Sequence, residues 1–130
     1  MFLPNNESTF HFKKQGERSK EWFEGVFTVK CLLNQAEQIQ VAIINDRYNG
    51  GVSTLPPKYA LLNRTLAELE ARIVKAPTWW TESQGGKTLY DTDIIFEVFK
   101  KAFEAEESWL KKVEDATKEA TANAEKPETK

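Results

Sequence analysis

The chain has 130 residues, of which 18 are basic and 20 acidic, and its formal net charge is −2 at pH 7. This balance provides no basic field that would attract nucleic acid or an anionic membrane surface. The single cysteine excludes an internal disulfide and cannot build a zinc site by itself. We find neither a run of ~20 apolar residues, which a membrane span needs, nor the pattern of a signal peptide at the start. We therefore expect one soluble domain in a cytosolic compartment, with no nucleic-acid or membrane partner.

Two segments near the start favour β-strands. Residues 9–13 alternate β-forming and polar side chains, and residues 22–31 are rich in aromatic and β-branched side chains. The polar connection between them contains Gly16 and suits a hairpin. In the second strand Phe23 and Phe27 share one face, whereas Trp22 lies on the other, so both faces carry apolar side chains.

Three helices are predicted after the hairpin. Asn34 and Glu37 have the spacing of a capping box and start a helix over residues 34–48. A second helix begins near Pro57 and runs to about Lys75, with an apolar stripe that we interpret as a core face. Pro77 ends this helix. Asp91 is the predicted N-cap of a third helix, which has a broad apolar face and ends near residue 117.

The order of these elements predicts an α+β fold, in which an N-terminal β-hairpin is followed by three amphipathic α-helices. We place one domain at residues 9–117, after a flexible N-terminus at residues 1–8. Residues 118–130 contain no bulky apolar side chain, and burial therefore cannot compensate the entropy lost on ordering. They are predicted to form a disordered C-terminal tail.

His11 and Cys31 are the first candidates for chemistry. His11 is the only histidine, so a transition-metal site is not expected. A Cys31–His11 nucleophile pair is conceivable across the hairpin. Cys31 lies among Val29, Leu32 and Leu33, however, and an apolar setting raises the pKa of a thiol and makes it inert.

Two further patterns resemble known sites without their context. Asp91, Asp93 and Glu97 could form a carboxylate cluster, but helix capping and the helix dipole already explain acidic residues at that position. The residues Gly85-Gly86-Lys87-Thr88 end like a phosphate-binding loop, yet the upstream glycine and a preceding parallel strand are missing. We predict no catalytic residue, no cofactor and no metal, and therefore no enzyme.

The adjacent tryptophans Trp79 and Trp80 are the strongest positive signal. One interpretation is that the indoles fill the end of the helical core, paired with Tyr90 or Phe96. The other is an exposed aromatic anchor for a partner, because tryptophan is over-represented among interface hot spots. Both can hold at once. The candidate partner-binding residues are Trp22, Phe23, Phe27, Trp79, Trp80 and Tyr90.

Three stretches together resemble a known family. They are the glycine-containing aromatic strand over residues 23–30, the segment over residues 66–80 that ends in Pro77-Thr78-Trp79-Trp80, and Asp91-Thr92-Asp93-Ile94-Ile95. This pattern is similar to that of small tail assembly chaperones of long-tailed bacteriophages, and it covers residues from about 9 to 113.

The resemblance implies a non-enzymatic helper that binds the tape measure protein and tail tube subunits in the host cytoplasm, with a homo-oligomer as a further candidate assembly. A small protein with spare aromatic surface suits an aggregation-prone client. The alternative is a structural virion component, such as a tail or neck adaptor, that forms a permanent symmetric ring.

Overall fold

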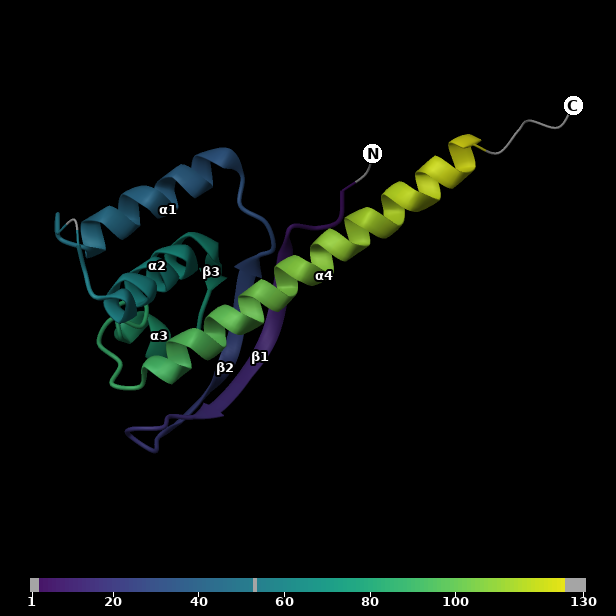
Figure 1. Ribbon diagram of the computed structural model, residues 1–130. Coiled ribbons are helices and arrows are strands. Elements are labelled where there is room, and N and C mark those ends of the chain that lie inside the picture. The colour runs from purple at the N-terminus through teal and green to yellow at the C-terminus, as the bar shows by residue number, and fades with distance from the viewer. Residues whose placement is uncertain (1–2, 53, 126–130) are drawn as a thin grey trace, which may run out of the picture.

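The computed structural model describes residues 3–52 and 54–125 (Figure 1). The predicted α+β class is confirmed, but the described residues form four helices and three strands instead of three helices and a hairpin. The helices are α1 (Gln35–Tyr48), α2 (Pro57–Arg72), α3 (Thr78–Glu82) and α4 (Thr92–Glu125), and the strands are β1 (Glu7–Gln15), β2 (Trp22–Lys30) and β3 (Ile73–Lys75).

The hairpin is longer than predicted. β1 and β2 pair antiparallel from Glu7 opposite Lys30 to Gln15 opposite Trp22, and β3 pairs with the other edge of β2, which gives the order β1-β2-β3. The alternation of side chains turns Phe23 and Phe27 to the inner face, as predicted, and Trp22 to the outer face.

Residues 3–8, which the sequence predicted to be flexible, contact the body of the protein. β1 already begins at Glu7, and the Asn6 side chain bonds to both backbone groups of Leu32. Pro4 accepts a hydrogen bond of 3.3 Å from the indole N–H of Trp109. These long-range contacts, which no local pattern signals, fasten the segment to the body.

The capping box at the start of α1 is confirmed. The Glu37 amide donates to Asn34 Oδ1 at 2.8 Å, and the Asn34 amide donates to Glu37 Oε1 at 3.0 Å. After the helix, Gly50 and Gly51 adopt left-handed φ angles of 63° and 77°, which glycine accepts without steric cost.

The second helix ends at Arg72 and not near Lys75. Residues 73–75 form β3, because Ile73 and Val74 are β-branched and the open edge of β2 offers hydrogen bonds that the helix end does not. The tryptophan corner then forms the short helix α3, which no helical periodicity indicated. Pairing with a distant strand outweighed the local helix preference here.

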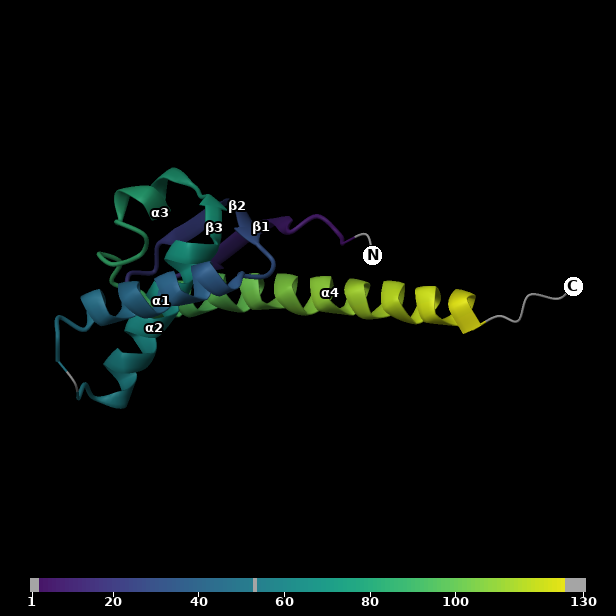
Figure 2. The same ribbon diagram turned by 90° about the horizontal axis from the view of Figure 1, so that it is seen from above.

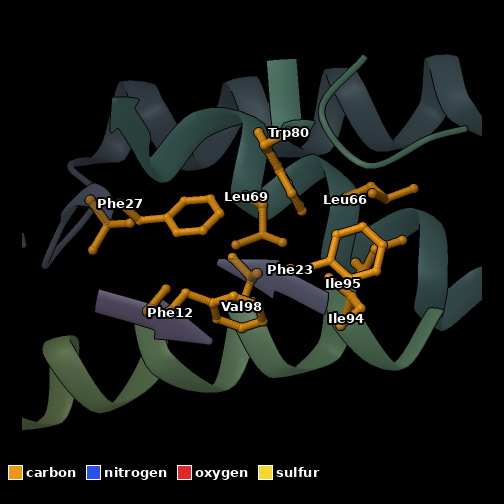
Figure 3. Packing of buried hydrophobic residues seen from close by; sticks show 11 residues of the cluster. Phe12, Phe23, Phe27, Leu66, Leu69, Trp80, Ile94, Ile95 and Val98 are labelled. Carbon is orange, nitrogen blue, oxygen red and sulfur yellow. The ribbon is translucent and has the colours of Figure 1, made fainter. Parts of the chain in front are cut away.

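The core lies between the inner face of the sheet and the helices α2, α3 and α4 (Figure 3). Aromatic side chains from the strands meet aliphatic side chains from the helices, and their removal from water is the main favourable term in folding. The fully or nearly fully buried members include Phe12, Phe23, Phe27, Val29, Leu66, Leu69, Trp80, Ile94, Ile95, Val98 and Ala102.

The last helix continues beyond the body of the protein. With 34 residues α4 is about 51 Å long at ~1.5 Å per residue. It crosses the sheet and extends past β1 in both views (Figures 1 and 2). The predicted helix end at residue 117 is too early, since α4 runs to Glu125. Residues 118–121 are exposed, as their composition predicted, and residues 126–130 lie outside the described part.

No helix within residues 3–52 and 54–125 combines the length and the apolar character that crossing a membrane requires.

Candidate protein-binding surfaces

The tryptophan corner belongs to the core. Trp80 is 4% exposed and packs edge-on against Phe27 with the ring centroids 5.6 Å apart. Trp79 is half-buried, lies 5.1 Å from the ring of Phe23, and donates its indole N–H to the carbonyl of Glu24 at 2.9 Å. The indoles therefore pair with strand phenylalanines, and the predicted pairing with Tyr90 or Phe96 does not appear among these ring contacts.

Gly25 allows this corner to approach the sheet. It lies on the inner face between Phe23 and Phe27, and a Cβ atom built on it would lie 2.5 Å from the Pro77 ring. Pro77 also extends the chain just before α3. The glycine in the aromatic strand thus makes room for the turn that inserts the tryptophans.

The six predicted binding residues do not form one exposed surface. Phe23, Phe27 and Trp80 are buried in the core, and Trp79 is half-buried. Trp22 is 64% exposed on the outer face of the sheet, where the Lys13 ammonium lies 5.6 Å from its ring. Tyr90, which precedes α4, is 78% exposed.

His11 and Cys31 lie on opposite faces of the sheet. His11 Nε2 is 3.1 Å from Glu24 Oε1 on the exposed outer face. Cys31 is buried, and its burial raises the pKa of the thiol. The sheet therefore separates the two groups, and the conceivable nucleophile pair does not form.

Asp91 joins the hairpin loop to the start of α4. Its buried carboxylate accepts the amides of Arg18 at 2.6 Å and Ser19 at 2.9 Å, together with the Ser19 hydroxyl. The hydrogen bond from the Ser19 hydroxyl, and to a smaller extent those from the two amides, lower the pKa of the Asp91 carboxyl. The carboxylate bonds found here go to the hairpin and not to the amides of its own helix, which corrects the predicted capping role.

The other acidic and glycine-rich candidates are also structural. Asp93 pairs with Lys14 at 3.6 Å. Within residues 3–52 and 54–125, no group of three or more His, Cys, Asp or Glu side chains is arranged to hold a metal ion. Gly86 lies against the Trp80 ring, and the Lys87 ammonium lies 4.5 Å from the Tyr48 ring. The glycine pair therefore forms a packed turn.

A groove with a volume of about 460 Å³ lies between α2 and α4. Phe99 and Phe103 stack along its α4 side, with their ring centroids 6.4 Å apart. Phe103 and Leu110, on the same helix, are 44% and 46% exposed. The remaining lining residues are Leu32, Leu33, Gln38, Arg64, Glu68, Arg72 and Glu106.

The floor of this α2–α4 groove is polar but fully paired. The buried Arg72 guanidinium bonds to Glu68 at 3.2 Å and to Glu106 at 2.8 Å, and it donates to the carbonyl of Cys31 at 3.0 Å. Arg72 thus holds α2, α4 and the end of the hairpin together. Since its hydrogen bonds are internal, the apolar wall on α4 is the part of the groove left for a partner.

Sequence reasoning did not select Phe103 or Leu110. Both belonged to the broad apolar face predicted for the last helix, and the breadth of that face was the available signal. A helix that packs against the core on one side buries only a stripe of side chains. A broader apolar face therefore leaves some apolar side chains exposed.

Comparisons with models of protein families, with curated proteins and with solved structures found no match for this chain. Any functional assignment therefore rests on the surfaces described above and on the resemblance noted from the sequence.

Proposed function

We propose that this protein acts by non-enzymatic binding to other proteins, and that the α2–α4 groove receives an amphipathic helix of the partner. The observation that carries the proposal is the exposure of Phe103, which lines the groove, and of Leu110, which lies seven residues further along α4. Seven residues correspond to about two helical turns, so the two side chains lie on one side of α4. Exposed apolar side chains grouped at a groove are typical of interaction sites.

A helix fits this surface better than an extended peptide. The groove is bounded by two helices, and a third helix can insert a ridge of side chains spaced by three and four residues. Arg64, which is exposed at the α2 side of the groove, and Glu104, exposed on α4, could pair with charges that flank the apolar stripe of the partner.

The resemblance to phage tail assembly chaperones supplies a candidate partner. The tape measure protein is expected to be long, helical and prone to aggregation, and it must be shielded until tail tube subunits surround it. We propose that the groove binds tape measure helices in the host cytoplasm and that the protein presents tube subunits to this complex.

The test combines two substitutions on the exposed apolar side of α4, Phe103→Glu in the groove wall and Leu110→Glu two turns further along the helix. Loss of two partly exposed anchors should weaken binding to a purified tape measure fragment by at least about 30-fold, which is the ~2 kcal/mol of a hot-spot residue. Ser108→Glu is the control for each single substitution, because this exposed position adds one glutamate on another side of α4. Full binding by the double variant would show that the groove is not the docking surface.

The far end of α4 favours one alternative, a structural virion component. The helix continues for 15 residues after Leu110, or about 22 Å, far enough to reach a neighbouring subunit in a ring. Analysis of purified particles distinguishes the two roles. A chaperone leaves the assembled tail, whereas an adaptor remains in it at a fixed number of copies.

A further inference from the structure

β1 is an edge strand with one open side. It has nine residues, and its only strand neighbour in the described part of the chain is β2. An edge strand presents a row of backbone donors and acceptors that can pair with another chain. β1 is therefore longer than a typical strand, which has about 5–6 residues.

The hydrogen bonds at the two ends of the hairpin show which groups face outward. The Gly16 amide bonds to the Glu21 carbonyl at 2.8 Å, and the Cys31 amide bonds to the Asn6 carbonyl at 2.7 Å. Bonded and non-bonded pairs alternate in an antiparallel ladder, so the even-numbered residues of β1 bond to β2. The odd-numbered residues Thr9, His11 and Lys13 therefore direct their N–H and C=O groups away from β2.

The same alternation explains a contact before the strand. Glu7 is odd-numbered, and its amide bonds to the Asn5 side chain at 3.2 Å. The outward amide of Glu7 is therefore already bonded within the chain. The outward N–H and C=O groups of Thr9, His11 and Lys13 are open to a partner.

The usual protection of an edge is weak here. β1 contains no proline, and its register with β2 runs without a bulge. Lysines guard only one end, and Lys14 is engaged by Asp93 at 3.6 Å. Proteins normally blunt long edges with prolines, bulges or charges. Because these protections are missing, the backbone groups in the middle of β1 are open to pairing with another chain.

α4 adds a second wall beside this edge. The helix passes over the inner face of the sheet and continues past β1 (Figures 1 and 2). Phe10, which stacks on Phe27 with the centroids 5.4 Å apart, is only half-buried on this face. A strand added to β1 would cover Phe10 and lie beneath the projecting helix.

We infer that the free edge of β1 accepts an extended segment of a partner protein as an antiparallel fourth strand, at a surface separate from the α2–α4 groove. The outer side chains of β1 set its chemistry. Glu7 and Lys13 carry opposite charges, and Thr9 and His11 lie between them. The complementary segment has an acidic side chain opposite Lys13, a basic one opposite Glu7, and apolar side chains toward Phe10.

The β1 strand of a second copy would also place Glu7 opposite Lys13 in an antiparallel pair, but a second copy is the less suitable occupant on steric grounds. Antiparallel pairing of two β1 strands about a twofold axis would place two α4 helices over the same joined strands (Figure 1). A single extended segment meets no such obstacle.

The probe is a capped peptide that spans the positions opposite Glu7 to Lys13, with glutamate opposite Lys13, lysine opposite Glu7, threonines on the outer face and valines on the inner face. It is used at concentrations at which it is monomeric. Binding should slow hydrogen exchange at the Thr9, His11 and Lys13 amides, measured by NMR. The Phe10 and Phe12 amides, which already bond to β2, should change little. No binding, or binding without protection of the odd-numbered amides, would overturn the inference.

Two variants at one position test the backbone contact. His11→Pro removes an outward donor without removing a bond to β2, and proline is tolerated on an edge in this orientation. It should weaken peptide binding by about tenfold. His11→Ala loses the same contact to Glu24 but keeps the amide, so it should bind as the unmodified protein does. Equal loss in both variants would contradict strand addition.

Further controls separate this site from the groove and keep the test valid if His11→Pro does not fold. A peptide with its two charges exchanged should bind at least about tenfold more weakly, and equal affinity would overturn the charge assignment. The Phe103→Glu and Leu110→Glu variant should bind the peptide normally. Failure of the groove experiment thus leaves this inference standing, and the reverse also holds.

Discussion

The tryptophan corner and the apolar row on α4 differ in what covers them. Trp79 and Trp80 follow a proline in a short connecting segment, and they lie against the phenylalanines of β2. Phe103 and Leu110 lie within a long regular helix, and nearly half of the surface of each residue is exposed. The segment that looked irregular in sequence is core, and the segment that looked like an ordinary core helix supplies the free apolar surface.

This difference shows that apolar content does not by itself distinguish a core from an interface. Burial depends on whether another element lies opposite. Gly25 gives the tryptophans a place on the sheet, whereas Phe103 and Leu110 lie on a side of α4 that the core does not cover. The following predictions test the two halves of the comparison.

The largest effect is expected for Trp80→Ala. A buried indole that is replaced by alanine leaves a cavity, and the free energy of unfolding should fall by about 3–5 kcal/mol. Trp22→Ala, at the exposed indole on the outer face, should change it by less than about 0.5 kcal/mol. Urea unfolding of both variants provides the measurement. If the two variants are equally stable, Trp80 is not a core residue and the corner is an exposed anchor.

Gly25→Ala should have the next largest effect. The new methyl group would meet the Pro77 ring, so the corner must shift away from the sheet. Overpacking of this kind costs about 1–3 kcal/mol of unfolding free energy. Val26→Ala, at the exposed neighbour, is the control for a change in strand propensity. A stable Gly25→Ala variant with unchanged tryptophan fluorescence would show that the corner does not need this approach.

Phe103→Ser should affect binding far more than folding. The side chain is partly exposed, so its loss should lower the free energy of unfolding by no more than about 1 kcal/mol. Ala102→Ser, at the buried preceding residue, is the control for a polar group placed in the core and should cost more. Thermal or urea unfolding decides between them. If Phe103→Ser proves the more damaging change, the row on α4 is part of the core after all.

The smallest effect is expected from deletion of residues 118–130. Residues 118–121 are exposed, and the ion pair between Lys118 and Glu114 lies in solvent, where such pairs contribute little to stability. The thermal midpoint should stay almost unchanged, while the helical circular dichroism signal decreases. A large drop in the midpoint would mean that the end of α4 docks on the body.

Local sequence signals predicted those helices and strands whose formation depends on neighbours close in sequence. Alternation of apolar and polar side chains placed the hairpin, and the Asn34–Glu37 box placed the start of α1, because both depend on neighbours a few residues apart. The α+β class followed from the order of these elements.

Tertiary structure alone decided where three other features lie. Residues 73–75 continued the helical pattern but joined the sheet, since the unpaired edge of β2 was available to them. Asp91 could cap its own helix but binds the hairpin loop, which sequence separates from it by more than 70 residues. Phe103 and Trp80 have similar apolar character in sequence, and only the presence or absence of a packed neighbour makes one a binding candidate and the other core. Such pairings between distant segments leave no local periodicity, and they become visible only once the chain is folded.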